Sequence, residues 1–70
     1  MMPLIFAPVG EENIIRKVGG NQEMKKHLED LGFVPGSSVT VISTIAGNLI
    51  VHVRESRVAI SREMAGKIMV

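Results

Sequence analysis

Two histidines and seven acidic residues are the side chains of this 70-residue chain that could ligate a metal ion. Transition-metal sites need three or four converging ligands, and their histidines are commonly oriented by a further hydrogen-bond partner. Glu23 and His27 form an i, i+4 pair on one segment, whereas His52 lies on another. The simpler interpretation is that His27 flanks an apolar stripe and His52 stands on the wet side of a strand. We therefore predict no metal site and no bound cofactor, and we regard the five methionines as core residues first.

The sequence also contains no motif for covalent catalysis or for phosphate binding. The chain has no cysteine, and it has no Gly-x-Ser-x-Gly nucleophile motif. Ser61 is better placed to cap a short helix than to attack a substrate. Gly19-Gly20 precedes a helix, but the Lys-Ser/Thr pair of a phosphate-binding loop does not follow it. We expect a protein that is not an enzyme and has no catalytic residue.

The charge balance narrows the choice of partners. Eight Lys and Arg against seven Asp and Glu give a net charge of +1, and the charges are interspersed along the chain. Nucleic-acid-binding proteins usually carry a basic stripe, and none is visible here, so no nucleic-acid partner is expected. The N-terminal apolar run at residues 4–7 is too short to insert into a membrane and has no basic flank. We expect one cytoplasmic domain over residues 1–70.

One helix is clearly indicated after the Gly19-Gly20 break. Asn21 is a suitable N-cap, and Met24, Leu28 and Leu31 recur on one face. Gly32 is placed to adopt the left-handed conformation that ends a helix, which would let the next residue, a phenylalanine, pack back onto the last turn.

The rest of the chain reads as short strands separated by turn residues. Residues 38–44 and 48–54 alternate in the manner of a hairpin, and the second run predicts one buried and one wetter face. A Val-Pro-Gly turn of type II precedes them at residues 34–36. Four further apolar runs are strand candidates. The run at residues 4–7 lies between two prolines and is at best an edge strand. The others are residues 13–18, residues 57–60 after a tight turn, and the closing residues 67–70. The pattern predicts a mainly β fold with one to two short helices, arranged as a small barrel or sandwich.

The order of these pieces resembles the FeoA family. The run LEDLGFVPGSSVTVIS, at residues 28–43, is similar to the central segment of that family, in which a helix ending in Leu-Gly-Phe enters a Pro-Gly turn and a Val-rich strand. The run VRESRVAISREMAGKIMV, at residues 53–70, is similar to its closing segment. The resemblance implies an SH3-like small β-barrel. It also implies a small cytosolic partner of FeoB, a membrane transporter of ferrous iron with a G-protein-like domain.

Three departures from the family pattern fall at possible contact positions. The loop around Ala46-Gly47 is shorter than in many members, Arg54-Glu55-Ser56 replaces a frequent Arg-Gly turn, and Met24-Lys25-Lys26 stands where many members carry arginines. None of them changes the fold that the resemblance implies.

Excess apolar surface is the feature most indicative of a partner. Ile42 and Ile50 fall on the faces opposite Val41 and Val51, so both are exposed if the hairpin has one wet side. An exposed apolar patch on a small domain usually marks a partner surface or weak self-association. The alternative is that a closed barrel with a helix laid across it buries part of both faces.

The predicted contact regions are the hairpin and the surface of the helix. The partner-binding residues expected there are Ile42, Ile50, His52, Lys25 and Lys26. The expected partner is the cytosolic part of a FeoB-type iron transporter, which the chain would modulate as a non-catalytic module. The alternative function is a regulatory SH3-like barrel related to the C-terminal domain of iron-dependent transcriptional repressors.

Overall fold

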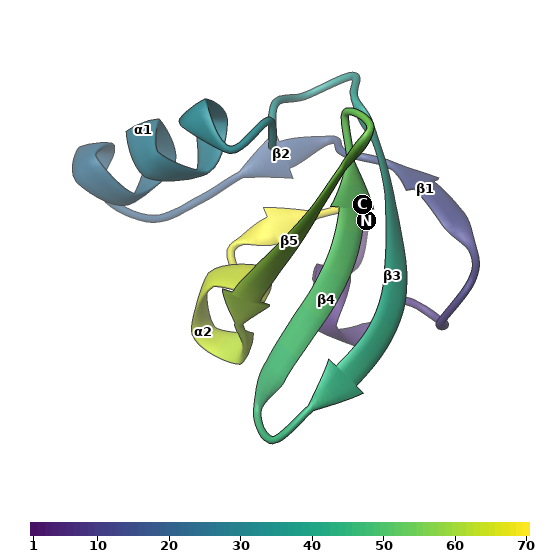
Figure 1. The fold of residues 1–70 in the computed structure, drawn as a ribbon. Coiled ribbons are helices and arrows are strands. Elements are labelled where there is room, and N and C mark those ends of the chain that lie inside the picture. Colours follow the sequence, from purple (N-terminus) through teal and green to yellow (C-terminus); the bar gives the residue numbers. More distant parts are fainter.

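A computed structural model describes residues 1–70 and arranges them in two antiparallel sheets with three short helical segments (Figure 1). A four-stranded sheet has the order β1-β3-β4-β5, and a two-stranded sheet pairs β2 with β6. The strands are β1 (Glu12–Ile14), β2 (Lys17–Val18), β3 (Ser38–Ile45), β4 (Asn48–Val53), β5 (Ser56–Ser61) and β6 (Ile68–Met69). The helical segments are the 3-10 turn η1 (Leu4–Phe6), α1 (Gln22–Asp30) and α2 (Arg62–Ala65). The predicted mainly β fold with short helices is confirmed.

Two tight turns connect β3, β4 and β5 into a meander. Ala46 and Gly47 both have positive φ, of 44° and 84°, and Arg54 and Glu55 have φ of 49° and 64°. Two central residues with positive φ make type I′ turns, whose twist matches that of the flanking strands. The predicted hairpin is therefore confirmed, and its connection is one residue shorter than expected, because Ile45 still pairs with Asn48.

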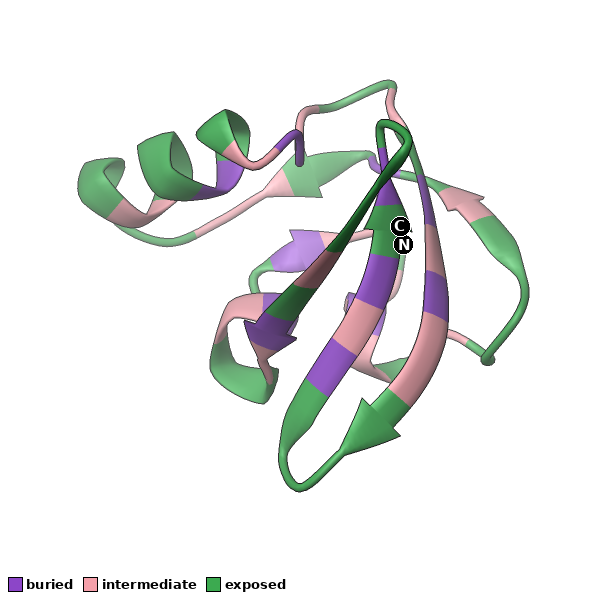
Figure 2. Ribbon diagram, viewed as in Figure 1, coloured by how far each residue is buried: buried purple, intermediate pink, exposed green.

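The core lies between the two sheets and takes alternate residues from β4 and from the first half of β3 (Figure 2). Val39 and Val41 of β3 point inward, and so do Leu49, Val51 and Val53 of β4, as their alternation predicts. No polar residue is buried. The core residues are Leu4, Ile15, Leu28, Phe33, Val39, Val41, Leu49, Val51, Val53, Ile60, Ala65, Ile68 and Val70.

The segment predicted as one strand at residues 13–18 is in fact two strands in different sheets. β1 pairs with β3, and β2 pairs with β6. The chain changes sheets at Ile15, whose N–H donates to the Ser37 carbonyl while the next residue, Arg16, donates to Met69, both at 2.8 Å. Ile15 is buried at this corner. Small barrels close at such points, where a strand leaves one sheet and enters another.

The prediction of an edge strand at residues 4–7 was wrong. These residues form η1, in which the N–H groups of Phe6 and Ala7 donate to Pro3 and Leu4, each at 3.0 Å. Pro3 and Pro8 flank the segment and have no N–H to give to a strand ladder. The tight turn points Leu4 into the core, where it is completely buried.

α1 begins and ends as the sequence predicts. The side chain of Asn21 accepts a hydrogen bond of 2.8 Å from the N–H of Met24. At the other end Gly32 has φ of 105°, and its N–H donates to Glu29 at 2.9 Å. The N–H of Phe33 reaches back to Leu28 at 2.9 Å, which completes a Schellman motif. Phe33 and Leu28 both enter the core, so this ending attaches a helix that otherwise projects from the barrel (Figure 1).

Asn13 is the one half-buried residue with an unsatisfied side-chain group. Its Nδ2 atom is buried without a hydrogen-bond partner, and its strand position is opposite the buried Val39. A buried donor without a partner costs about 1–3 kcal/mol, and valine fits a strand better than asparagine does.

We therefore expect Asn13→Val to raise the free energy of unfolding by about 1–2 kcal/mol in urea denaturation. Asn48→Val at an exposed strand position is the control, and it should change stability by less than about 0.5 kcal/mol. A loss of stability in Asn13→Val would show that the amide is satisfied in solution.

Candidate partner-docking surface

The outer face of the four-stranded sheet carries most of the residues predicted to bind a partner. Ser43 pairs with Ile50, and Ile50 pairs with Ala59 on β5, so these three lie in one row. The register shifts between Val41 and Ser43, which leaves Ile42 as the extra residue of a β-bulge. Two residues of a bulged strand oppose one residue of the partner strand, so Ile42 and Ser43 both lie opposite Ile50. The structure therefore brings Ile42 and Ile50 together.

The apolar surface is larger than these two isoleucines. Ile42 and Ile50 are each half-buried, which lies between the two outcomes considered from the sequence. Ile45, paired with Asn48 at the end of the same hairpin, is 58% exposed, and Ile14 at the sheet's β1 edge is 46% exposed. Ile45 lies at the hairpin end of the outer face, next to the half-buried pair. Ile14 lies at the opposite end, and the Glu12–Thr40 pair stands between it and Ile42. Together these four residues form what we call the isoleucine face.

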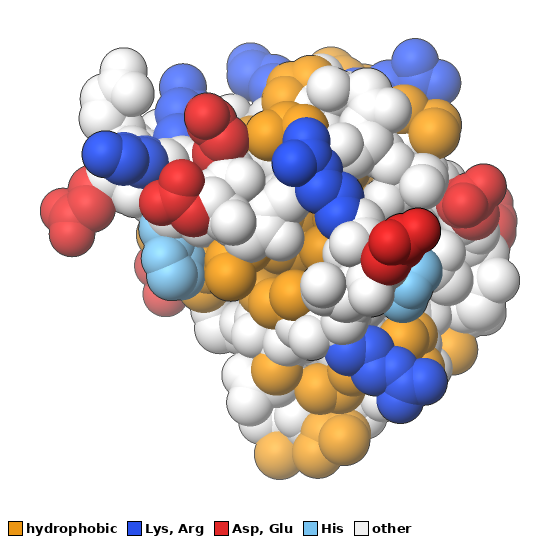
Figure 3. All heavy atoms as spheres, turned by 45° about the horizontal axis from the view of Figure 1, so that its top comes forward, with side chains coloured by type: hydrophobic (Ala, Val, Ile, Leu, Met, Phe, Trp, Pro, Cys, Tyr) orange, Lys and Arg blue, Asp and Glu red, His pale blue; other side chains and the backbone are white.

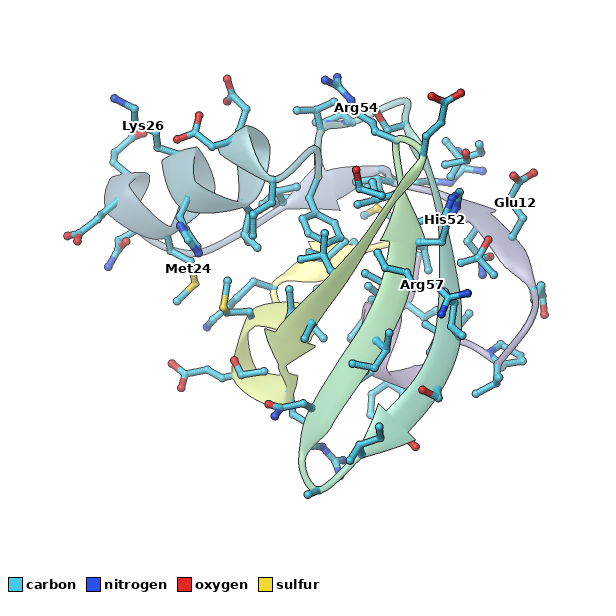
Figure 4. The ribbon with its side chains drawn as sticks, viewed as in Figure 1. Glu12, Met24, Lys26, His52, Arg54 and Arg57 are labelled. Carbon is cyan, nitrogen blue, oxygen red and sulfur yellow. The ribbon has the colours of Figure 1, made fainter.

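A polar row crosses the same face next to Ile50. The register aligns Glu12, Thr40, His52 and Arg57 across β1, β3, β4 and β5. His52 is exposed and stands beside Arg57, with Glu12 on the far strand (Figure 4). The prediction that His52 occupies the wet side of its strand is confirmed. Its neighbours offer one carboxylate and one cation, which suit the polar rim of an interface.

The two histidines are far from each other. His27 is exposed on α1, where it lines a hollow of about 350 Å³ together with Asn21, Glu23, Met24 and Met64. His52 stands on the sheet, and the two pale-blue side chains are well separated in Figure 3. Met24 points from α1 toward α2 (Figure 4) and packs against the core. No group of three or more His, Asp or Glu side chains is arranged to hold a metal ion.

The two predicted lysines of α1 have different surroundings. Lys25 lines a hollow with Arg16 and Lys17, against the apolar wall of residues 33–35. Lys26 is exposed, lines no hollow and points away from the barrel (Figure 4). Neither lysine belongs to the isoleucine face, so the predicted contact set divides between two surfaces. Sequence reasoning missed Arg16 and Lys17, although their adjacency was a possible signal.

None of the helices is long and apolar enough to cross a membrane.

The two side-chain hydrogen bonds are both helix caps. The side chain of Asn21 caps α1, and the hydroxyl of Ser61 caps α2 by accepting a hydrogen bond of 3.2 Å from the N–H of Met64. The predicted role of Ser61 as a cap is confirmed. No arrangement of a nucleophile with a base occurs among these bonds.

Two solved FeoA structures have this fold. A crystal structure of the iron uptake regulatory protein FeoA matches with a TM-score of 0.89 and 26% identity, covering 97% of this chain and 92% of the other. FeoA of Stenotrophomonas maltophilia, described as a prokaryotic SH3-domain protein and complexed with zinc, matches with a TM-score of 0.85 and 24% identity over 99% and 88% of the two chains. The predicted SH3-like barrel is confirmed.

A repressor shares the barrel as part of a longer chain. A manganese-dependent transcriptional repressor matches with a TM-score of 0.85 and 17% identity, covering 94% of this chain but 38% of that one. At this identity the likeness concerns the fold alone.

Sequence comparison identifies the family. A protein of Methanocaldococcus jannaschii, named as a candidate Fe(2+) transport protein A, is 39% identical over 70 residues, which is all of this chain and 85% of that one. The FeoA domain family itself matches residues 2–70. This chain belongs to the FeoA domain family.

Proposed function

We propose that this chain is a non-catalytic accessory of ferrous-iron uptake that docks on the cytosolic part of a FeoB-type transporter and modulates it. The observation that carries the proposal is the isoleucine face on a domain of the FeoA family. Ile42, Ile45 and Ile50 give a 70-residue domain an apolar surface that a partner can cover, and Ile14 lies across the polar row from them. Ferrous iron is the cargo of the transporter in this proposal, and no step passes through a metal bound to this chain.

The outer face has the composition of a docking surface. Ile42, Ile45 and Ile50 form its apolar part, and the Glu12–Arg57 row borders them on the side toward Ile14. Interfaces commonly combine an apolar centre with a polar rim. The paired strands present these groups on a rigid support, so little ordering entropy is lost on binding.

Ile50→Glu tests this assignment, because it places a charge at the centre of the face. We expect it to weaken binding to the cytosolic domain of the host's FeoB at least tenfold, since burying an unpaired carboxylate is costly. Calorimetry with and without guanine nucleotide measures the effect. Ile50→Val, which keeps an apolar β-branched residue, is the matched control and should bind within about twofold of the parent.

Circular dichroism of both variants shows whether the barrel remains folded. Absence of binding by the parent protein in every nucleotide state, at high micromolar concentration, would contradict docking on the soluble domain. Equal binding by Ile50→Glu and the parent would instead move the interface to another face. An apparent molecular mass that rises with the concentration of the isolated chain would reveal the weak self-association that the same face allows.

A second candidate is a regulatory barrel acting on a DNA-binding protein, which is compatible with the fold shared with the manganese-dependent repressor. In that case the chain would bind a separate DNA-binding protein and not the transporter. A pull-down from the host with the parent and Ile50→Glu distinguishes the two partners. Recovery of a DNA-binding protein, lost in Ile50→Glu, would favour this candidate.

A further inference from the structure

The fold gathers cations that are dispersed in the sequence. Arg16, Lys17 and Lys25 line one hollow of about 310 Å³ between β2, α1 and the turn after α1. Lys17 also lines a second hollow of about 410 Å³ with Lys67, Gly66 and Met69 at β6. The two hollows thus adjoin along the β2–β6 ribbon. We call this surface the basic groove.

The basic groove has a higher net positive charge than the chain as a whole. It holds four cations and one carboxylate, Glu29. The whole chain carries eight Lys and Arg against seven Asp and Glu, so the remaining surface is net negative. The side-chain hydrogen bonds are the two helix caps, so none of these cations is hydrogen-bonded to a carboxylate. Such an arrangement attracts an anionic ligand to one part of the surface.

The walls of the groove are apolar and recessed. Val18, Val34 and Pro35 line the first hollow beside the buried Phe33, and Met69 lines the second. These walls can receive the aliphatic parts of an entering chain while the cations meet its carboxylates. Figure 3 shows Lys and Arg side chains standing along the upper edge of the view, with hydrophobic atoms between them.

We propose that the basic groove binds an acidic, extended segment of a partner protein. A segment crossing β2 at Lys17 meets Lys25 and Arg16 on one side and Lys67 on the other. Two features disfavour other anions. Nucleic-acid binding without sequence preference combines a longer basic track with exposed aromatic stacking groups, but Phe33 is buried. An anionic membrane presents a flat surface of headgroups, whereas these cations line hollows.

The test uses a short synthetic peptide of alternating glutamate and valine, with its glutamine counterpart as the control ligand. We expect the glutamate peptide to shift the backbone amide resonances of residues 16–18, 25 and 67 in an NMR titration at low salt. The glutamine peptide should leave them in place. Binding should weaken several-fold between about 20 mM and about 300 mM salt, because exposed charges are screened.

Lys25→Glu and Lys26→Glu form the matched pair of variants. The two lysines are neighbours on α1, each has an acid four residues on, and both substitutions change the net charge equally. Lys25→Glu should weaken the glutamate peptide about fivefold, and Lys26→Glu by less than about twofold. Lys17→Glu, which alters both hollows, should weaken it about tenfold.

Three results would overturn the inference. The first is an equal effect of Lys25→Glu and Lys26→Glu on peptide binding. The second is equal binding of the glutamate and glutamine peptides. The third is Lys17-dependent binding of phosphatidylglycerol vesicles or single-stranded DNA when the glutamate peptide does not bind. If the partner is the transporter, the inference deepens the docking proposed above. The peptide titration does not use the transporter, so its failure and the failure of docking on FeoB can be told apart.

Discussion

Phe33→Ala should remove most of the stability of this domain. Phe33 is 1% exposed and is the largest buried side chain of a core that is otherwise aliphatic. Truncating a buried phenylalanine costs about 3–5 kcal/mol, from lost transfer free energy and from the cavity left behind. A 70-residue domain has about 4–10 kcal/mol in total. Phe33 also follows Gly32 at the end of α1, so the helix loses its anchor on the barrel with the same substitution.

The two phenylalanines of the chain provide an internal comparison. Phe6 is 67% exposed, so Phe6→Ala should change the free energy of unfolding by less than about 0.5 kcal/mol. Urea denaturation followed by circular dichroism measures both variants. If Phe33→Ala does not fold, Phe33→Leu should fold with a loss of about 1–2 kcal/mol. Losses of equal size in Phe33→Ala and Phe6→Ala would show that Phe33 is not part of the core in solution.

Gly32→Ala is expected to cost about 2–3 kcal/mol, for two separate reasons. The φ of 105° at Gly32 disfavours any residue with a Cβ atom by about 1–2 kcal/mol. A Cβ atom there would also lie 3.1 Å from Cδ of Arg54, which covers the end of α1. Arg54 must then shift from its place over the helix terminus.

Gly36→Ala separates the two reasons. Gly36 has a φ of 93°, close to that of Gly32, but a Cβ atom there meets nothing within 4 Å. Its cost should therefore be the conformational term alone, about 1–2 kcal/mol. The difference between the two alanine variants in urea denaturation reports the contact with Arg54. A cost at Gly32 no larger than that at Gly36 would mean that Arg54 moves aside freely.

Features determined by neighbours in the chain could be predicted from the sequence. The cap at Asn21, the Schellman ending at Gly32 and the cap at Ser61 each depend on residues within a few positions of one another. The turn at residues 34–36 is of the same kind, since the N–H of Ser37 donates to Val34 at 3.1 Å and Gly36 takes positive φ. The hairpin alternation was equally legible, because one face of β4 is buried along its whole length.

Features determined by remote pairing were the ones that sequence reasoning missed. The run at residues 13–18 looks like one strand, and nothing in it reveals that Ile15 turns a corner between two sheets. Residues 4–7 have strand composition, yet burial of Leu4 at the end of the barrel selects a tight turn. The bulge at Ile42 depends on how β3 meets β4, and no residue type there signals it.

The candidate surfaces divide in the same way. Ile50 and His52 could be placed on the outer side of a strand, because strand alternation is local. The basic groove could not be found by searching for a stripe, because Lys67 reaches Lys17 only through the pairing of β2 with β6. The sequence predicted Lys25 only as a residue on the helix surface. The hollow that distinguishes Lys25 from Lys26 is visible only in the structure.

The two ends of the chain are joined by backbone hydrogen bonds, from Met2 to Val70 at 2.9 Å and from Val70 to Met2 at 2.8 Å. These contacts enclose nearly the whole polypeptide in one loop, so their closure entropy is the largest in the molecule. The β3–β4–β5 meander needs only two-residue turns and forms from local contacts. We infer that the meander assembles early and that the joined ends complete the barrel last. By the same reasoning, weakening the terminal pairing would accelerate unfolding while leaving the folding rate nearly unchanged.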